Sequence, residues 1–256
     1  MKNIAIVTGA GGGFGKELTK LLLKENDIDE IWAIGRNEEK LARLKDELGD
    51  KINPLPLDLS HRESYSKIAE RLKEEPTRVA YLINNAGYAK FCSYSDVDVD
   101  GTLNMIDLNV CAVVALCLAC IPHMDKGCRI MNVSSLSSFF PLPYLNTYAS
   151  TKVFVRNYTR ALNVELRDKG ITATAVCPGW MSTELYDRAK IGAKKEANNY
   201  FGMKHPADVA KKAFKDTKKG KAFSTYGIYV KSIHLLSKLL PKRLLMRFWM
   251  MQQKIK

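Results

Sequence analysis

The sequence predicts an α/β fold in which helices cover both faces of a doubly wound, parallel sheet of about seven strands. Short apolar runs alternate with amphipathic segments through the first 180 residues. Several runs are apolar at every position, which is typical of strands buried on both faces of a parallel sheet. Strand–helix units with right-handed crossovers build such a sheet. The runs that we expect as strands are residues 3–8, 30–34, 51–57, 79–84, 127–133 and 171–177.

The segments between these runs place apolar side chains at helical spacing. In residues 14–24, Phe14, Leu18 and Leu22 are four apart and predict a helix with one buried face. The other expected helices are residues 38–48, 62–73, 101–124 and 148–167. No internal repeat or Pro/Gly-rich linker interrupts the pattern. We therefore predict one domain, residues 1–227, followed by a C-terminal helical extension, residues 228–256.

The composition fits a folded globular protein. The 256 residues are 46% hydrophobic and 26% charged, which argues against disordered, collagen-like and disulfide-scaffold classes. A predicted strand begins almost at Met1, and the longest apolar run, residues 110–121, is far shorter than the roughly 20 residues that span a bilayer. We therefore expect a cytoplasmic or membrane-peripheral location.

Cysteines and histidines give no sign of a metal site. Cys117 and Cys120 form a CxxC inside an apolar helical run, with no second pair at zinc-ligand spacing. We expect these thiols to be reduced and packed in the core, because free cysteine behaves as a small hydrophobe. The four histidines are scattered along the chain, so we expect surface or packing roles for them and predict no metal.

The positive charge is concentrated near the C-terminus. The chain has a formal net charge of +13, and residues 204–256 contain 14 lysines or arginines against two aspartates, so the other 203 residues contribute about +1. No nucleic-acid-reading motif accompanies this charge, and we predict no nucleic-acid partner. The charge therefore gives information about what the C-terminal extension binds, and not about the function of residues 1–203.

A glycine-rich turn follows the first expected strand and precedes the first expected helix. It reads Thr8-Gly9-Ala10-Gly11-Gly12-Gly13-Phe14-Gly15. Glycines let the backbone approach a pyrophosphate closely, and the start of the helix offers unpaired N–H groups. The strand–turn–helix context predicts a dinucleotide site here.

The end of the second strand indicates which dinucleotide binds. An NAD site usually has a carboxylate at this position, which holds the ribose 2′-hydroxyl. This chain has Gly35 and Arg36 instead, and the planar guanidinium of Arg36 suits a 2′-phosphate. We therefore predict NADP(H) as the cofactor, with a solvated surface arginine as the alternative interpretation.

Further motifs follow the glycine turn along the chain. Residues 84–87 read NNAG, and a YxxxK pair begins at Tyr148. Asp58-Leu59, Asn109, Ser135 and the Pro178-Gly179 pair followed by Thr183 stand between and after them. With these motifs in this order, and with a glycine turn that matches TGxxxGxG, the sequence resembles the short-chain dehydrogenase/reductase family. The segment after Arg36 is similar to NADP(H)-dependent hydroxysteroid dehydrogenase-like members. The last 60 or so residues carry no diagnostic motif.

The resemblance implies a single-domain Rossmann fold and a set of site residues. The implied catalytic tetrad is Asn109, Ser135, Tyr148 and Lys152. The residues expected at the cofactor are Gly9, Gly11, Gly13, Phe14, Gly15, Arg36, Asp58, Leu59, Asn85, Ala86, Gly87, Tyr148, Lys152, Pro178, Gly179 and Thr183.

The tetrad suits hydride-transfer chemistry. Tyr148 and Lys152 are four apart, so they share one face of a helix. A phenol has a pKa of about 10, and we expect the neighbouring ammonium to lower the pKa of Tyr148 so that it acts as general acid and base. Ser135 would hydrogen-bond the substrate oxygen, with Ser134, Ser137 and Ser138 as nearby rivals. Asn109 would either position a proton-relay water, as the family does, or satisfy a local backbone group.

The segments that line the substrate cleft of the family are apolar and aromatic in this chain. We expect substrate contacts from Ser135, Tyr148, Tyr88, Leu145, Trp180 and Tyr186. This lining favours a bulky apolar ketone or secondary alcohol, such as a hydroxysteroid or a bile acid. A 3-oxoacyl thioester carried by an acidic protein is one alternative. A noncatalytic NADP-binding regulator is another, although it would not need the intact tetrad.

The C-terminal extension interleaves apolar and basic side chains. Basic flanks and an interfacial tryptophan, Trp249, are typical of an amphipathic segment on an anionic membrane. The alternative is a helix pair that packs over the substrate cleft or on a neighbouring subunit. Pro241 is expected to divide the extension into two helices. We expect a homodimer built on the helices that contain Asn109 and Tyr148, with a tetramer as the alternative.

Overall fold

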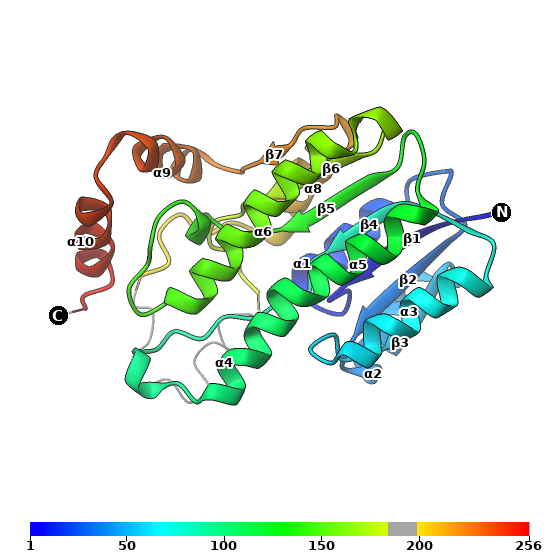
Figure 1. Ribbon diagram of the computed structural model, residues 1–256, viewed down its shortest axis with the longest axis horizontal. Helices are drawn as coiled ribbons and strands as arrows, with labels where there is room; N and C mark the ends of the chain where they lie inside the picture. The colour runs from blue at the N-terminus through cyan, green and yellow to red at the C-terminus, as the bar shows by residue number, and fades with distance from the viewer. Residues whose placement is uncertain (184–198, 256) are drawn as a thin grey trace.

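The computed structural model describes residues 1–183 and 199–255, and it is built on a parallel sheet of seven strands (Figure 1). The order across the sheet is β3-β2-β1-β4-β5-β6-β7, which confirms the doubly wound α/β fold. The strands are β1 (Lys2–Thr8), β2 (Glu30–Gly35), β3 (Ile52–Pro56), β4 (Thr77–Asn84), β5 (Arg129–Val133), β6 (Thr172–Val176) and β7 (Phe223–Ser224).

Helices cover both faces of this sheet. The helices are α1 (Gly13–Leu22), α2 (Glu38–Leu48), α3 (Arg62–Glu74), α4 (Val99–Ile106), α5 (Ala112–Cys120), α6 (Asn146–Glu165), α8 (Pro206–Lys218), α9 (Ile228–Leu239) and α10 (Lys242–Gln252). One core contains buried side chains of α1, α2 and α8, among them Leu18, Leu41 and Phe214. The core on the other face contains side chains of α3, α5 and α6, such as Leu72 and Val155.

The sheet differs from the sequence prediction at its edge. Strand β7 has only two residues and pairs with β6, and the six expected runs did not include it. A strand of two residues is too short to be recognised in the sequence as an apolar run or as an apolar–polar alternation. Other strand boundaries differ from the prediction by one or two residues, as in β4, which begins at Thr77.

The long helix expected over residues 101–124 is divided into three segments. Helix α4 passes into a π-helical segment, Asp107–Cys111, which continues as α5. The expected helix is present as one continuous stretch, Val99–His123, but apolar content could not reveal where its backbone changes from i→i−4 to i→i−5 hydrogen bonds. The π-helical segment contains Asn109, and such segments often occur at functional sites.

The stretch Val99–His123, which includes α4 and α5, is long and apolar enough to cross a membrane by length and composition, with a mean hydropathy of 2.2 in its most apolar window. In the fold it is a layer beside the sheet: α5 packs on α3 and β4, and Leu116, Cys117 and Cys120 are buried in the core. Cys117 and Cys120 thus have the packing role that the sequence predicts.

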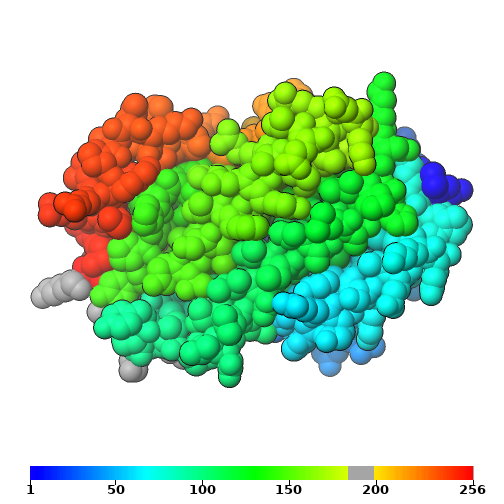
Figure 2. Space-filling view, in the orientation of Figure 1, coloured from blue at the N-terminus to red at the C-terminus, as the bar shows by residue number. Residues whose placement is uncertain are grey.

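The C-terminal extension folds back onto the body of the protein. Helices α9 and α10 are separated at Pro241, as predicted, and stand at one end of the molecule, shown in orange to red in Figures 1 and 2. Ile233 of α9 and Leu245 and Trp249 of α10 are buried in a third apolar cluster with Phe91 and Leu145.

Candidate active site

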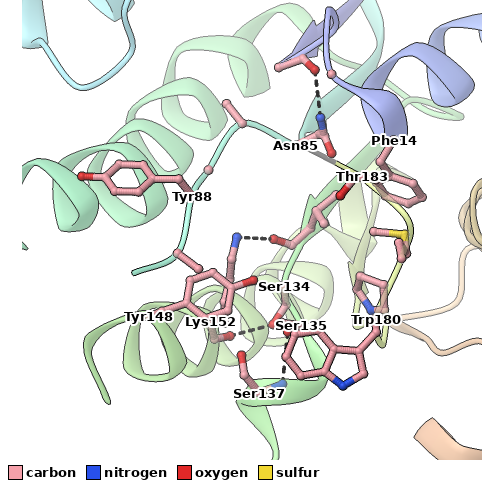
Figure 3. A pocket seen from close by; sticks show the side chains of 18 of the residues that line it. Phe14, Asn85, Tyr88, Ser134, Ser135, Ser137, Tyr148, Lys152, Trp180 and Thr183 are labelled. Atoms are coloured by element: carbon pink, nitrogen blue, oxygen red, sulfur yellow. Dashed lines mark hydrogen bonds between the residues drawn. The ribbon is translucent and has the colours of Figure 1, made fainter. Parts of the chain in front are cut away.

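Most of the predicted site residues line one cavity of about 1,100 Å³, at the carboxyl ends of the central strands; Asp58 and Asn109 do not line it. Ligands of open α/β sheets bind at this edge, because the loops that leave neighbouring strands diverge there. One end of the cavity is lined by the glycine turn after β1, and the other by aromatic side chains (Figure 3).

The glycine turn has a backbone that only glycine can build. Gly9 has a φ of +65°, and a Cβ on Gly15 would lie 2.2 Å from the Gly9 carbonyl oxygen. Helix α1 begins directly after Gly12, whose position provides no side-chain cap, so the first N–H groups of the helix remain for a ligand. This cradle fits the pyrophosphate of a dinucleotide.

The turn after β4 is fastened to the glycine turn. The Thr8 hydroxyl accepts hydrogen bonds from the backbone N–H groups of Asn85 and Ala86, both at 2.9 Å. The Asn85 side-chain amide donates to the carbonyls of Thr8 at 3.0 Å and Gly9 at 3.2 Å (Figure 3). The two motifs that the resemblance placed at the cofactor thus form one hydrogen-bonded unit.

The cavity continues past the end of β2. Arg36 lines it, and its guanidinium lies 3.7 Å from the carboxylate of Asp58. That carboxylate also accepts hydrogen bonds from the Ser60 backbone and hydroxyl, at 3.0 and 2.7 Å. Leu59 lines the cavity as predicted. Lys40, in the first turn of α2, lines the same part, and sequence reasoning missed it although it follows Arg36 by only four residues.

Tyr148 and Lys152 lie one turn apart on α6, beside the end of β5. Ser135, which follows β5, stands beside the Tyr148 hydroxyl. The Lys152 side chain is buried, and its ammonium donates to the Val133 carbonyl at 2.9 Å, while it lies 5.7 Å from the centre of the Tyr148 ring. Figure 3 shows these side chains converging in the cavity. Ser134 instead donates to the Lys152 carbonyl at 2.7 Å, which favours Ser135 for the substrate contact.

The electrostatics of this pair differ from the sequence expectation. Burial raises the pKa of Tyr148 to about 12, although the hydrogen bond from Ser135 opposes the shift. Burial lowers the pKa of Lys152 to about 8. Lys152 is not among the groups that shift the pKa of Tyr148, so desolvation determines the direction of the shift and the lowering expected from the ammonium is not seen. Tyr148 is a protonated phenol at neutral pH, ready to donate.

Asn109 shapes the loop after β4. Its side chain is fully buried in the π-helical segment; its Oδ1 accepts from the Tyr88 N–H at 3.1 Å and its Nδ2 donates to the Tyr88 carbonyl at 3.0 Å. The same amide donates to the Thr151 hydroxyl at 3.2 Å. The amide thus satisfies a local backbone group, which was one of the two predicted roles, and it fixes the chain beside Gly87. The water-relay role stays a prediction.

The loop after β6 is held in place by two backbone hydrogen bonds to Lys204. The Lys204 N–H donates to the Trp180 carbonyl at 2.9 Å, and the Lys204 carbonyl accepts from the Ser182 N–H at 3.2 Å. This arrangement brings Thr183 beside the glycine turn, so that a Cβ on Gly13 would contact its methyl group at 3.4 Å. The structure therefore brings together the two distant motifs expected to enclose the cofactor.

The far end of the cavity is apolar. Tyr88, Leu145 and Trp180 line it as predicted, but the Tyr88 hydroxyl is bonded to the Gly101 carbonyl at 2.9 Å and to Asn104 at 3.1 Å. The Tyr88 hydroxyl is therefore held by the fold, and Figure 3 shows its side chain pointing away from Tyr148 and Lys152. Tyr186 lies outside the described residues.

The C-terminal extension completes the apolar end, which the motifs did not reveal. Ile233 of α9 and Phe248, Trp249 and Gln252 of α10 line the cavity. The Trp249 indole donates to the Pro143 carbonyl at 3.0 Å and thereby fastens α10 to the loop before α6. These contacts agree with the expected alternative in which the extension packs over the cleft.

A family model described as short chain dehydrogenase matches residues 3–193, three-quarters of the chain. The chain belongs to the short-chain dehydrogenase family. It is therefore an oxidoreductase of the dehydrogenase/reductase class, built on a fold that binds a nicotinamide cofactor. The cavity with its glycine cradle and its tyrosine–lysine pair is the site that this family membership leads one to expect.

Known relatives agree with this family, and the solved structures among them contain different cofactors. Sulfoacetaldehyde reductase 2 of Chromohalobacter salexigens is 31% identical over 194 residues, which cover 72% of this chain and 75% of that protein. A short-chain dehydrogenase from Sphingobium yanoikuyae, solved with NADPH, has a TM-score of 0.77 at 24% identity and covers 96% of both chains. One from Burkholderia phymatum, solved with NAD, has a TM-score of 0.78 at 20% identity, with 93% and 95% covered. These two structures show the same fold with different cofactors.

Proposed function

We propose that the chain interconverts a bulky apolar ketone and its secondary alcohol with NADP(H), as a hydroxysteroid or bile-acid dehydrogenase does. The observation that carries the proposal is the position of the Tyr148 hydroxyl. It lies in one cavity between a glycine cradle for a dinucleotide and an apolar pocket for a substrate. A proton donor at that position serves the oxygen of a carbonyl group that receives hydride.

The chain's own residues supply orientation and a proton. NADPH, when bound along the glycine turn and the Asn85–Gly87 loop, supplies the hydride. In reduction, the Tyr148 hydroxyl donates its proton to the substrate oxygen, and the Ser135 hydroxyl hydrogen-bonds the same oxygen as negative charge develops on it. The Lys152 ammonium stabilises the phenolate that remains. In oxidation the same groups act in reverse, and Tyr148 takes the proton of the alcohol.

The preference for NADP(H) rests on the end of β2. No carboxylate follows this strand directly, and the guanidinium of Arg36 lines the cavity together with Lys40. A 2′-phosphate placed there would lie beside two positively charged side chains. The 2′-hydroxyl of NAD would need a carboxylate partner. Asp58 is the nearby candidate, and its carboxylate already accepts hydrogen bonds from Ser60.

The preference for an apolar substrate rests on the far end of the cavity. Aromatic and aliphatic side chains from the body and from the C-terminal extension line it: Phe91, Phe140, Leu142, Leu145, Trp180, Ile233, Phe248 and Trp249. A small charged aldehyde would leave this surface unfilled, and its charge would lose hydration without a partner.

The test is a panel of carbonyl compounds followed at the NADPH absorbance band. We expect steroid and bile-acid ketones to be reduced with a higher kcat/KM than small charged ketones, and NADPH to be preferred over NADH. Arg36→Gln should raise the KM for NADPH about tenfold or more, as one charged hydrogen bond is worth roughly 1.5–3 kcal/mol, and leave the KM for NADH unchanged. Preference for 3-oxoacyl thioesters or for NADH would contradict the proposal.

We also propose a homodimer formed through α5 and α6. Their outward faces expose large apolar side chains, namely Leu118 on α5 and Phe154 and Val164 on α6. Isolated apolar residues are normal on a surface, but a group of them on adjacent long helices favours association. Light scattering should give the mass of two chains, and Leu118→Glu should give one; a wild-type monomer would contradict the proposal.

A further inference from the structure

Helix α9 carries apolar side chains on two opposite sides. Its inner side buries Val230 and Ile233 in the core. Its outer side exposes Ile228, Leu235 and Leu239, the last with 70% of its surface accessible. Residues seven and eleven positions after Ile228 return to within about 20° of it around a helix. The three therefore form one continuous apolar stripe that faces away from the protein.

Helix α10 repeats this arrangement. Leu245 and Trp249 are buried, whereas Leu244, Phe248 and Met251 are exposed and fall within about 60° of one another around the helix. The two exposed stripes, Ile228–Leu235–Leu239 and Leu244–Phe248–Met251, are called the outer stripes below. Both belong to the end of the molecule drawn in orange to red in Figure 2.

Cations border the outer stripes, and the surrounding sequence contains no acidic residue. Lys231 and Lys238 stand three residues after Ile228 and Leu235, and Arg247 stands three after Leu244, so each lies beside a stripe. Residues 217–256 contain ten lysines or arginines and no aspartate or glutamate. An apolar stripe with basic borders is the pattern of helices that lie on anionic lipid.

Phe248 connects the outer stripe of α10 to the cavity. Its side chain is 44% exposed and also lines the apolar end of the cavity. A surface that contacts the outer stripe would therefore lie beside the entrance to the pocket. Pairing of this surface with a second copy is disfavoured, because two faces that are rich in cations would repel each other.

We propose that α9 and α10 dock the protein on the surface of an anionic lipid membrane through the outer stripes. The apolar side chains enter the interfacial region of the bilayer, and the basic borders meet lipid phosphates. This surface does not take part in the hydride-transfer chemistry, so the proposal stands independently of the proposed activity.

Co-sedimentation with lipid vesicles tests the proposal directly. The full chain should sediment with phosphatidylcholine vesicles that contain phosphatidylglycerol and much less with phosphatidylcholine alone, and high salt should weaken the binding. Lys231→Gln with Lys238→Gln should weaken it about 30-fold, roughly five- to sixfold for each cation. Leu239→Gln with Met251→Gln should weaken it about tenfold or more.

Matched controls separate docking from general charge and from folding. Lys45→Gln with Lys67→Gln removes two exposed lysines elsewhere, and Val99→Gln replaces an exposed apolar residue on α4; both should bind vesicles as the wild type does. Tyr148→Phe should also bind normally, which distinguishes docking from catalysis. The proposal is overturned if the wild type does not bind anionic vesicles. It is also overturned if the control variant Lys45→Gln with Lys67→Gln loses as much binding as the variant Lys231→Gln with Lys238→Gln. It is also overturned if substitutions in the outer stripes change only the oligomeric mass.

Discussion

Tyr148 owes its chemical state to what surrounds its hydroxyl. Sequence reasoning placed an ammonium beside a phenol and expected an acidic phenol, but Lys152 donates to the Val133 carbonyl and the enclosed phenol has its pKa raised to about 12. A charge at a given spacing can be predicted from sequence, whereas the desolvation that opposes it depends on the folded environment.

The pKa of Lys152 predicts a pH dependence. Its pKa is lowered to about 8 by burial, so its positive charge is present below pH 8 and is lost as the pH rises through that value. The charge stabilises the phenolate that forms on Tyr148, so kcat/KM for reduction with respect to NADPH should fall above about pH 8. Tyr148 stays protonated throughout this range. A pH profile of initial rates that is flat up to pH 9.5 would contradict this.

The sequence could predict residues whose role depends on local spacing. Tyr148, Lys152 and the glycine turn were located by such patterns and lie together in the structure. Lys40 and Trp249 were not assigned to the site, because their places at the cavity result from tertiary contacts. The hydroxyl of Tyr88, which bonds to the α4 region, likewise could not be oriented from sequence.

At the scale of elements, the turn between β1 and α1 is the part of the cofactor end where an added side chain is least tolerated. A Cβ on Gly15 would stand 2.2 Å from the Gly9 carbonyl oxygen, whereas one on Gly12 would stand 3.4 Å from the same atom. The two glycines therefore provide a matched pair, in which one position forbids a methyl group and the other accommodates it.

Gly15→Ala should weaken NADPH binding about 5- to 150-fold, because moving the turn costs roughly 1–3 kcal/mol. Gly12→Ala should bind NADPH within a few-fold of the wild type. Fluorescence titration with NADPH measures both. Equal affinities for the two variants would show that the turn does not hold the pyrophosphate.

Sequence patterns located most elements but not the irregular ones. The alternation of apolar runs and amphipathic segments gave six of the seven strands because each run is long enough to be recognised. The π-helical segment around Asn109 and the short β7 depend on partners elsewhere in the chain: the Tyr88 backbone for the first and strand β6 for the second. No local pattern contains that information.

At the scale of the whole molecule, the C-terminal extension joins the catalytic body through Trp249. Its indole is 5% exposed, packs against Phe91 with ring centres 6.2 Å apart, and donates to the Pro143 carbonyl. Sequence reasoning left open whether the extension binds a membrane, covers the cleft or packs on a neighbouring subunit. The buried sides of α9 and α10 face the cleft, and we propose that their exposed sides bind a membrane.

Trp249→Ala should lower the free energy of unfolding by about 3–5 kcal/mol and raise the KM for an apolar ketone, since it removes part of the pocket wall. The KM for NADPH should be unchanged. Trp249→Phe retains the apolar contact and loses only the hydrogen bond, so it should lower the free energy of unfolding by about 1 kcal/mol. Urea unfolding and steady-state kinetics measure these effects, and an unchanged substrate KM for Trp249→Ala would argue against its place at the pocket.

The central claim is that Tyr148 donates the proton that accompanies hydride transfer. Tyr148→Phe retains the ring and its packing and removes only the hydroxyl, so NADPH binding should be unchanged. Ketone turnover should fall by about 10²–10⁴-fold, the usual contribution of a positioned acid. Turnover within a few-fold of the wild type, measured on protein that binds NADPH normally, would contradict the claim.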